Sequence, residues 1–167
     1  TTTLIQLVKA YSIIANGGYN IDPTLIKNKN RNKRERILND DVSKKILPIL
    51  RKIVSTKNGT ASLANVTGFE VGGKTGTAQK SINGVYTNKK INSFLSVFPT
   101  SKPKFVMAVM LDEPKISKDY IYHYRDGSNI KYKGTPFNTA GWTAVEVTGQ
   151  ILDKIGPILA TKYSEVY

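Results

Sequence analysis

The sequence predicts an α+β fold in which helices cover an antiparallel sheet of three strands. Apolar residues recur at helical spacing in two segments near the start of the 167-residue chain and in one at its end. Residues 71–111 between them contain β-branched runs separated by Asn-Gly and proline, which is typical of successive strands. The last two of these strands are joined only by residues 99–103, too few for a crossover, so we expect a meander.

The first helix is expected over residues 4–15, between a threonine cap at position 2 or 3 and the Gly17-Gly18 stop. The apolar face should pack in the core. After it, residues 19–26 are expected to be extended. The apolar residues of this helix recur at helical spacing and include Leu4, Leu7, Tyr11 and Ile14.

A second helix is expected to begin at residues 39–41, whose asparagine and aspartates suit an N-terminal cap. Pro48 falls inside its apolar pattern, so we expect a kink or a late start. Residues 27–36, which precede it, hold six basic residues and one acid. Because this stretch has no aromatic residues and no helical face, we expect an exposed loop rather than a nucleic-acid-binding segment.

Three strands should follow. The first contains residues 71–79, and Asn83-Gly84 with residues 88–90 should form the turn that leads out of it. The second strand is expected over residues 91–98, where Pro99 ends it. The third, residues 105–111, is apolar on both faces, which predicts that helices or other layers cover both sides.

A long polar loop is expected after Asp112 and Glu113, which we interpret as strand-terminating residues. The loop extends to Pro136 and contains the single histidine, His123, which we expect at the surface. A last helix should start at residue 138 or 139 and lie across the sheet, with Trp142 as a packing anchor and Pro157 near its end.

The composition sets limits on partners and metals. Lysine and arginine number 25 against 12 acidic residues, a net charge of +13, which suits an anionic partner or a solvated basic surface. We favour the solvated basic surface over an anionic partner. No nucleic-acid partner is expected, since basic and aromatic residues do not alternate. No cysteine is present, and one histidine does not support a zinc site, so no metal or cofactor is expected. No run approaches the ~18 apolar residues of a membrane span.

The chemistry of the chain centres on residues 71–79, which contain the motif Lys74-Thr75-Gly76. In an extended strand Lys74 and Gly76 lie on one face. Thr75 and Thr77 lie on the other. Gly76 lets another backbone approach, Lys74 offers a mobile positive charge, and the hydroxyls can donate to a carboxylate. The pattern indicates a strand that binds a peptide ending in a carboxylate.

Two other function classes compete with this one. Residues 68–75 also fit the phosphate-binding pattern of nucleotide hydrolases, and residues 106–113 resemble their apolar strand ending in acid. A phosphate-binding loop requires a helix that begins at Lys74 and Thr75, whereas residues 76–88 have the composition of a strand and a turn. A P-loop-type nucleotide-binding protein is therefore the less favoured alternative. The other alternative is a non-catalytic peptide-binding module that uses the same strand.

Lys-Thr-Gly is a signature of penicillin-binding proteins and class A β-lactamases. The order of elements makes the resemblance specific, because essentially the whole chain resembles the C-terminal part of the transpeptidase domain of a class B, division-type penicillin-binding protein. The further stretches that carry the resemblance are residues 3–7 with 15–18, residues 93–99, residues 104–114 and residues 139–142.

The resemblance implies a serine D,D-transpeptidase that cross-links cell-wall stem peptides ending in D-Ala-D-Ala and is acylated by β-lactams. In that family Lys74, Thr75 and Gly76 would bind the substrate, with Lys74 and Thr77 in the catalytic set. The amide of Thr77 would donate to the oxyanion, and its hydroxyl would contact the carboxylate. Other division proteins of the envelope are the implied partners, in the periplasm or on the extracytoplasmic face of the inner membrane.

The family's Ser-x-x-Lys and Ser-x-Asn motifs precede Lys-Thr-Gly, and neither does so here. The formal matches at residues 101–104, 128–131 and 81–83 lie downstream in expected turns or loops. We therefore expect residues 1–167 to be the C-terminal part of one transpeptidase domain, with the nucleophile and a membrane anchor in a missing N-terminal part. Such a fragment should be inactive alone, and the outer edge of its third strand should drive self-association.

Overall fold

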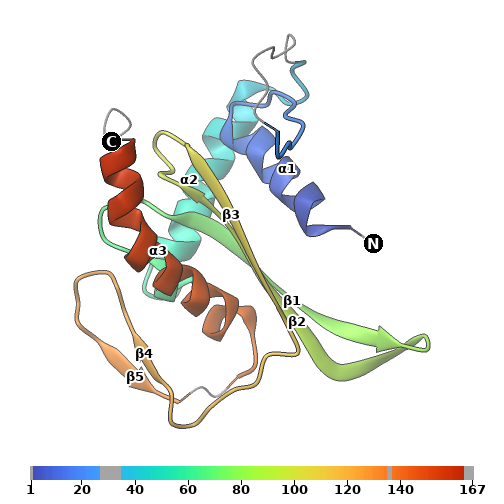
Figure 1. The fold of residues 1–167 in the computed structure, drawn as a ribbon, viewed down its shortest axis with the longest axis vertical. Coiled ribbons are helices and arrows are strands. Elements are labelled where there is room, and N and C mark those ends of the chain that lie inside the picture. The colour runs from blue at the N-terminus through green and yellow to red at the C-terminus, as the bar shows by residue number, and fades with distance from the viewer. Residues whose placement is uncertain (1, 27–34, 135–136, 164–167) are drawn as a thin grey trace.

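The computed structural model describes residues 2–26, 35–134 and 137–163. Three α-helices, two short 3-10 helices (η1 and η2) and two antiparallel sheets make up this part of the chain (Figure 1). In chain order the elements are α1 Leu4–Ala15, α2 Asp40–Ser55, η1 Ser62–Ala64, β1 Gly72–Ile82, β2 Val85–Phe98, β3 Phe105–Asp112, β4 Ile121–His123, β5 Lys131–Lys133, η2 Ala140–Trp142 and α3 Ala144–Lys162.

The main sheet is the expected meander, with β1, β2 and β3 paired in that order and antiparallel. One row across the sheet aligns Thr77 with Asn92 and Asn92 with Leu111. Asn83 and Gly84 connect β1 to β2 with positive φ values of 53° and 80°, as a tight primed turn requires. Within the described residues β1 and β3 each pair with one strand only, so each leaves its outer edge unpaired.

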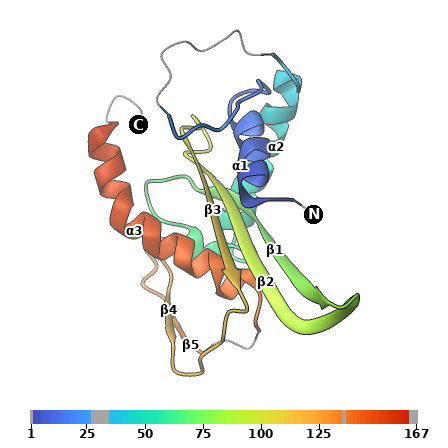
Figure 2. The same cartoon turned by 45° about the vertical axis from the view of Figure 1, so that its right-hand side comes forward.

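Helices cover both faces of the sheet, as predicted from the third strand, β3, which is apolar on both sides and lies at one edge of the sheet. Figures 1 and 2 show α3 against one face and α1 with α2 on the opposite side. The α3 side holds the main core, where Phe94 and Phe98 of β2 are buried together with Val145 and Leu152 of α3. The Phe98 ring also stacks on Phe105 of β3, with 5.3 Å between the ring centroids.

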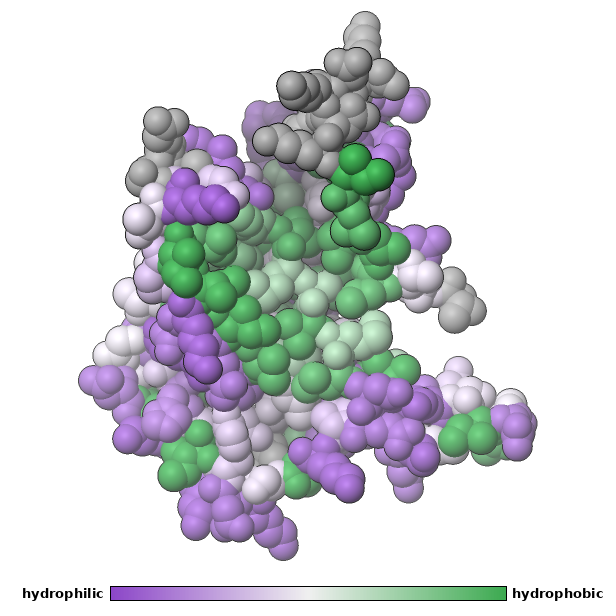
Figure 3. Space-filling view, viewed as in Figure 1, coloured by the Kyte–Doolittle hydropathy of each residue, from purple (hydrophilic) through white to green (hydrophobic). Residues whose placement is uncertain are grey.

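The α1 side of the sheet is packed more loosely. Helix α1 is apolar but contains no buried residue, and Ile5 is 55% exposed. On the neighbouring strand β3, Met110 is 41% exposed and most other residues are only partly buried. Figure 3 shows the result as a continuous apolar area on the viewed face, over β3 between α1 and α3.

The helix predictions for α1 and α2 are confirmed, with two differences of detail. Thr3 caps α1 through a capping box with Gln6, so the cap lies at the second of the two expected positions. Helix α2 begins at Asp40 with Pro48 inside it, so a late start is wrong. Of the basic stretch 27–36, residues 27–34 lie outside the described part, as does Pro136.

Two strand predictions need correction. Strand β2 begins at Val85 rather than at residue 91, because Asn83-Gly84 alone makes the turn and the polar residues after it continue an exposed hairpin. The segment after β3 was predicted to be a loop, yet β4 and β5 pair there, with Tyr122 opposite Tyr132. Tyr122 is buried and contacts Trp142 at 5.0 Å between ring centroids, which explains why so short a hairpin is held.

None of the described helices has the length and apolar content needed to cross a membrane. Within the same residues, no three histidine, aspartate or glutamate side chains gather as a metal site.

Candidate functional site

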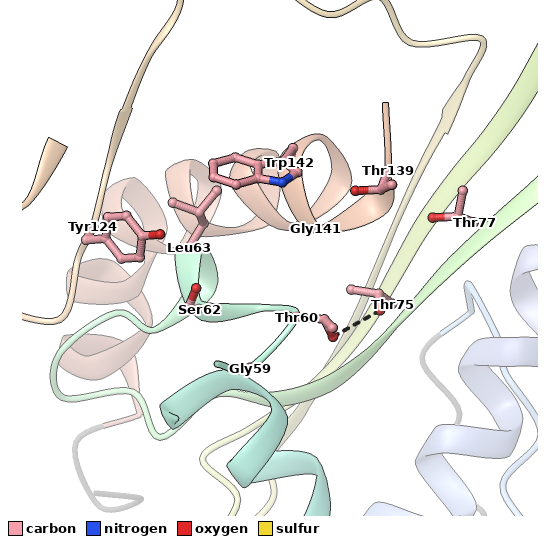
Figure 4. A pocket seen from close by; sticks show the side chains of 10 residues that line it. All are labelled: Gly59, Thr60, Ser62, Leu63, Thr75, Thr77, Tyr124, Thr139, Gly141 and Trp142. Atoms are coloured by element: carbon pink, nitrogen blue, oxygen red, sulfur yellow. Dashed lines mark hydrogen bonds between the residues drawn. The ribbon is translucent and has the colours of Figure 1, made fainter. Parts of the chain in front are cut away.

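A cleft of about 360 Å³ lies beside β1, at the start of α3 (Figure 4). Strand β1 contributes Thr75 and Thr77, whose side chains are on the same face of the strand, as the alternation predicts. The remaining walls come from three segments far apart in the sequence: Gly59, Thr60, Ser62 and Leu63 after α2, Tyr124 after β4, and Thr139, Gly141 and Trp142 at η2.

The glycines of β1 let this strand lie close to its neighbours. A Cβ atom on Gly73 would meet the Phe94 ring at 2.6 Å and also the backbone carbonyl of Leu95. At Gly76, among the described residues, a Cβ atom would meet the Oγ of Ser93, at 2.7 Å. Gly73 is therefore needed for packing, whereas Gly76 meets a single side chain that can rotate.

Lys74 is exposed and is not among the residues that line the cleft. Its ammonium donates to the backbone carbonyl oxygen of Thr75 at 2.9 Å. Strand carbonyls lie close to the plane of the sheet, so this contact holds the charge beside the backbone of β1 rather than away from it. The side chain is long enough to move from there to an anion at the cleft.

Both threonine hydroxyls of β1 are tied to the opposite walls. The Oγ1 atoms of Thr60 and Thr75 are 3.3 Å apart and share one hydrogen bond. Thr77 Oγ1 accepts a hydrogen bond from the backbone N–H of Ala140 at 3.0 Å. Because a hydroxyl has one proton and can accept independently, Thr77 keeps its own proton available for a carboxylate.

A buried ion pair supports the wall that carries Tyr124. Arg125 donates to Glu146 of α3 through two nitrogens, each 2.9 Å from a carboxylate oxygen, and the side chains are 11% and 5% exposed. The hydrogen bond to Glu146 raises the pKa of the Arg125 guanidinium. Arg125 also donates to the carbonyl of Leu63, so the pair connects two walls of the cleft to α3.

Tyr120 completes this cluster. Its hydroxyl donates to Glu146 Oε1 at 2.9 Å. Burial, and then this hydrogen bond, raises the pKa of the Tyr120 phenol to about 12. The phenol therefore stays protonated over the physiological range and remains a donor to the carboxylate.

The structure brings Thr75 and Thr77 together in one cleft, with Gly76 between them and Lys74 beside the same backbone. Trp142 packs between Tyr122 and Tyr132, as expected of an anchor, and it also lines the cleft. The sequence did not identify the other walls. Thr139 and Trp142 belong to residues 139–142, which carry the family resemblance. The resemblance alone did not show that these residues lie beside the motif strand.

The phosphate-binding alternative is wrong. Lys74 and Thr75 lie inside the strand Gly72–Ile82, where no helix begins, so the amide cluster that would hold a phosphate is absent from this described segment. The acidic residues at the end of β3 bind a lysine instead. Lys80 lies 2.9 Å from Asp112 and 2.8 Å from Glu113, which fits their interpretation as strand-terminating residues.

In a comparison with protein families, the model described as "Penicillin binding protein transpeptidase domain" matches residues 1–130. The chain is 30% identical over 169 residues to the probable peptidoglycan D,D-transpeptidase FtsI of Caulobacter vibrioides, covering 95% of this chain and 26% of that protein. It is 32% identical over 119 residues to the probable peptidoglycan D,D-transpeptidase PenA of Neisseria flavescens, covering 71% and 30%. The chain thus spans less than a third of these curated relatives.

Solved structures agree with these matches. The transpeptidase domain of Burkholderia pseudomallei penicillin-binding protein 3 superposes with a TM-score of 0.72 and 27% identity, covering 97% of this chain and 43% of that one. Penicillin-binding protein 3 of Mycobacterium tuberculosis superposes with a TM-score of 0.68 and 24% identity, covering 93% and 36%, which is a likeness of fold.

Proposed function

This chain belongs to the penicillin-binding protein transpeptidase family, and we propose that it supplies the substrate-binding strand of a peptidoglycan D,D-transpeptidase. The observation that carries the proposal is the pair of hydroxyls on Thr75 and Thr77, which face one cleft from a strand whose outer edge is unpaired within the described residues. The similarity of the chain to relatives named D,D-transpeptidases supports the same proposal.

We assign the motif residues as follows. Lys74 and the hydroxyls of Thr75 and Thr77 hold the terminal carboxylate of the stem peptide, because two hydroxyls face the cleft from this strand and a mobile cation lies beside its backbone. Gly76 leaves room for the peptide backbone because it carries no side chain. The backbone N–H of Thr77 is one donor to the oxyanion of the tetrahedral intermediate.

The nucleophile of this reaction is a serine that we place outside residues 1–167. Its oxygen attacks the carbonyl carbon of the penultimate D-Ala, the C–N bond breaks, and the terminal D-Ala leaves with a proton. A second stem peptide's amine then displaces the serine from the ester. The chain covers 43% of a solved transpeptidase domain and leaves an apolar area over α1 and β3, which suits burial by the rest of that domain.

The cellular setting follows from the substrate. We place the site in the periplasm or on the extracytoplasmic face of the inner membrane, with a membrane anchor outside this chain. The expected ligands are stem peptides ending in D-Ala-D-Ala and β-lactams, and other division proteins of the envelope are the expected partners.

A kinetic experiment tests the assignment. The longest product of the gene is incubated with a penicillin, and the second-order rate of acylation is compared between the natural sequence and the Thr75→Val variant. We expect the rate to fall roughly 10-fold to 100-fold, the effect of losing one hydrogen bond to a charged group.

The Thr161→Val variant is the matched control, because Thr161 is exposed near the end of α3, where its hydroxyl donates to the carbonyl of Pro157. Acylation of this variant should match the natural rate. If Thr75→Val is acylated as fast as Thr161→Val, the carboxylate assignment is wrong, and a strand that binds peptides without catalysis becomes the better account.

A further inference from the structure

Residues 138–143 form one wall of the cleft, and all three strands of the main sheet hold this segment at the same end. From β1, Thr77 accepts the N–H of Ala140 at 3.0 Å. Two residues after the end of β3, the carbonyl of Pro114 accepts a hydrogen bond from Asn138 Nδ2 at 2.7 Å. The strand between them, β2, contributes Asn92, which lies directly across from Thr77 in the sheet register.

Asn92 makes two contacts with the wall, although it is completely buried. Its Nδ2 donates to Asn138 Oδ1 and to Thr143 Oγ1, each at 2.9 Å. Lys90 of the same strand donates to the backbone carbonyl of Asn138 at 3.1 Å. The two ends of the wall, Asn138 and Thr143, are therefore joined by a single amide nitrogen of β2.

The donors and acceptors of this network have only one consistent arrangement. Asn138 must direct its nitrogen to the Pro114 carbonyl, so its oxygen faces Asn92. The Thr143 hydroxyl donates its proton to the carbonyl of Thr139 at 2.9 Å, so its oxygen can only accept a hydrogen bond from Asn92. Asn92 must present its nitrogen to both, and an apolar residue at this position would leave one buried acceptor, on Thr143, and one partly buried acceptor, on Asn138, without this donor.

This arrangement has a cost, because Asn92 Oδ1 is buried and has no hydrogen-bond partner in the described structure. A buried side chain chosen for packing alone would not leave a polar atom unpaired beneath the cleft. The orphaned oxygen therefore indicates that the nitrogen end of the amide is what the fold needs at this position.

We propose that Asn92 is a positioning residue, which holds residues 138–143 against the Lys-Thr-Gly strand so that the N–H of Ala140 stays on the Thr77 hydroxyl. With that acceptor position of Thr77 filled, the hydroxyl proton is directed to the substrate carboxylate. Asn92 does not touch the substrate. The inference rests on the proposed function for its catalytic consequence, but the positioning of Ala140 can be measured without any ligand.

The test compares two substitutions on one strand, Asn92→Ala and Ser96→Ala, by amide hydrogen exchange of this chain. Ser96 is also fully buried and has a single side-chain hydrogen bond, to the Met107 carbonyl, with no contact to the wall. In Asn92→Ala we expect the Ala140 amide to exchange roughly 5-fold to 10-fold faster relative to the core amides of β2. In Ser96→Ala, Ala140 and the core should change by the same factor.

Equal changes at Ala140 and in the core of the Asn92→Ala variant would overturn the proposal, since a purely structural residue affects both alike. If that variant does not fold, Thr143→Val provides the same test, because it removes the acceptor of Asn92 from the wall. Its Ala140 amide should again lose protection selectively, and a uniform loss would likewise overturn the proposal.

The catalytic consequence is measured on the longest product of the gene. The rate of acylation by a penicillin should fall in Asn92→Ala and stay unchanged in Ser96→Ala. Equal rates in the two variants would overturn the positioning role. Absence of acylation in the natural sequence would instead refute the proposed function, and the exchange experiment would still decide whether Asn92 holds the wall.

Discussion

Replacing Glu146 by leucine should reveal how much the buried ion pair with Arg125 stabilises the fold. Leucine keeps the volume of the side chain but removes the charge that Arg125 meets with two 2.9 Å contacts. The two side chains are 5% and 11% exposed, so solvent cannot replace the lost partner. Removing one member of such a pair costs about 3 to 5 kcal/mol.

We expect a loss near the lower end, about 3 kcal/mol, because Arg125 keeps its hydrogen bonds to the carbonyls of Leu63 and His123. For a chain of this length the melting temperature should fall by roughly 6 to 12 °C. The assay is urea denaturation followed by circular dichroism, with the free energy of unfolding taken from the midpoint and slope. The Arg125→Met/Glu146→Leu double variant should recover about half of the loss, since no charge is then left unpaired.

The matched control is Asp22→Asn, which breaks the pair that Asp22 forms with Lys9 on the surface, where the side chains are 81% and 35% exposed. That change should cost less than about 1 kcal/mol. A loss below about 1 kcal/mol for Glu146→Leu, or a double variant less stable than the single one, would refute the argument that the buried charge needs its partner.

Three further predictions concern the strand and its surroundings. Gly73→Ala should destabilise the chain by about 2 to 3 kcal/mol, because the added Cβ meets the backbone of β2, whereas Gly76→Ala should cost less than about 1 kcal/mol. Both losses are measured by urea denaturation, and equal losses would contradict the packing argument. The raised pKa of Tyr120, about 12 against 10.0 for a free phenol, means that its contribution to stability is full below pH 10 and is lost as the pH rises towards 12. Tyr120→Phe should flatten the pH dependence of the unfolding midpoint in that window, and an unchanged slope would count against the assignment. Thr77→Ser should retain the natural rate of acylation, because serine keeps the hydroxyl that accepts from Ala140, while the rate in Thr77→Val should fall roughly 10-fold or more. Equal rates in the two variants would exclude a role for this hydroxyl.

The sequence predicted the parts of the fold that depend on local pattern. The apolar periodicity of α1 and α2 and the short connection 99–103 led to the observed helices and meander. The alternation along β1 also predicted that Thr75 and Thr77 share a face, and both line the cleft. These inferences succeeded because strand and helix geometry fix which side chains lie together within one element.

The remaining walls of the cleft could not be predicted, because they depend on contacts between distant segments. Thr60, after α2, and Ala140, in η2, reach the motif strand only in the folded chain, and nothing in the sequence near either residue indicates that contact. The sequence predicted no role for Arg125 or Glu146, because nothing local shows that these two charges, 21 residues apart, pair in the folded chain with side chains 11% and 5% exposed. Asn92 was not singled out by the sequence, because its burial and its position opposite Thr77 follow from the pairing of β1 with β2.

The most direct test of the account is the intact mass of the longest gene product after incubation with a penicillin, followed by location of the modified residue. The account predicts one covalent adduct per chain, on a serine outside residues 1–167, and no adduct on residues 1–167 alone. An adduct on a serine within this chain would contradict the placement of the nucleophile. Absence of any adduct on the longest product would contradict the proposed acyl-transfer function.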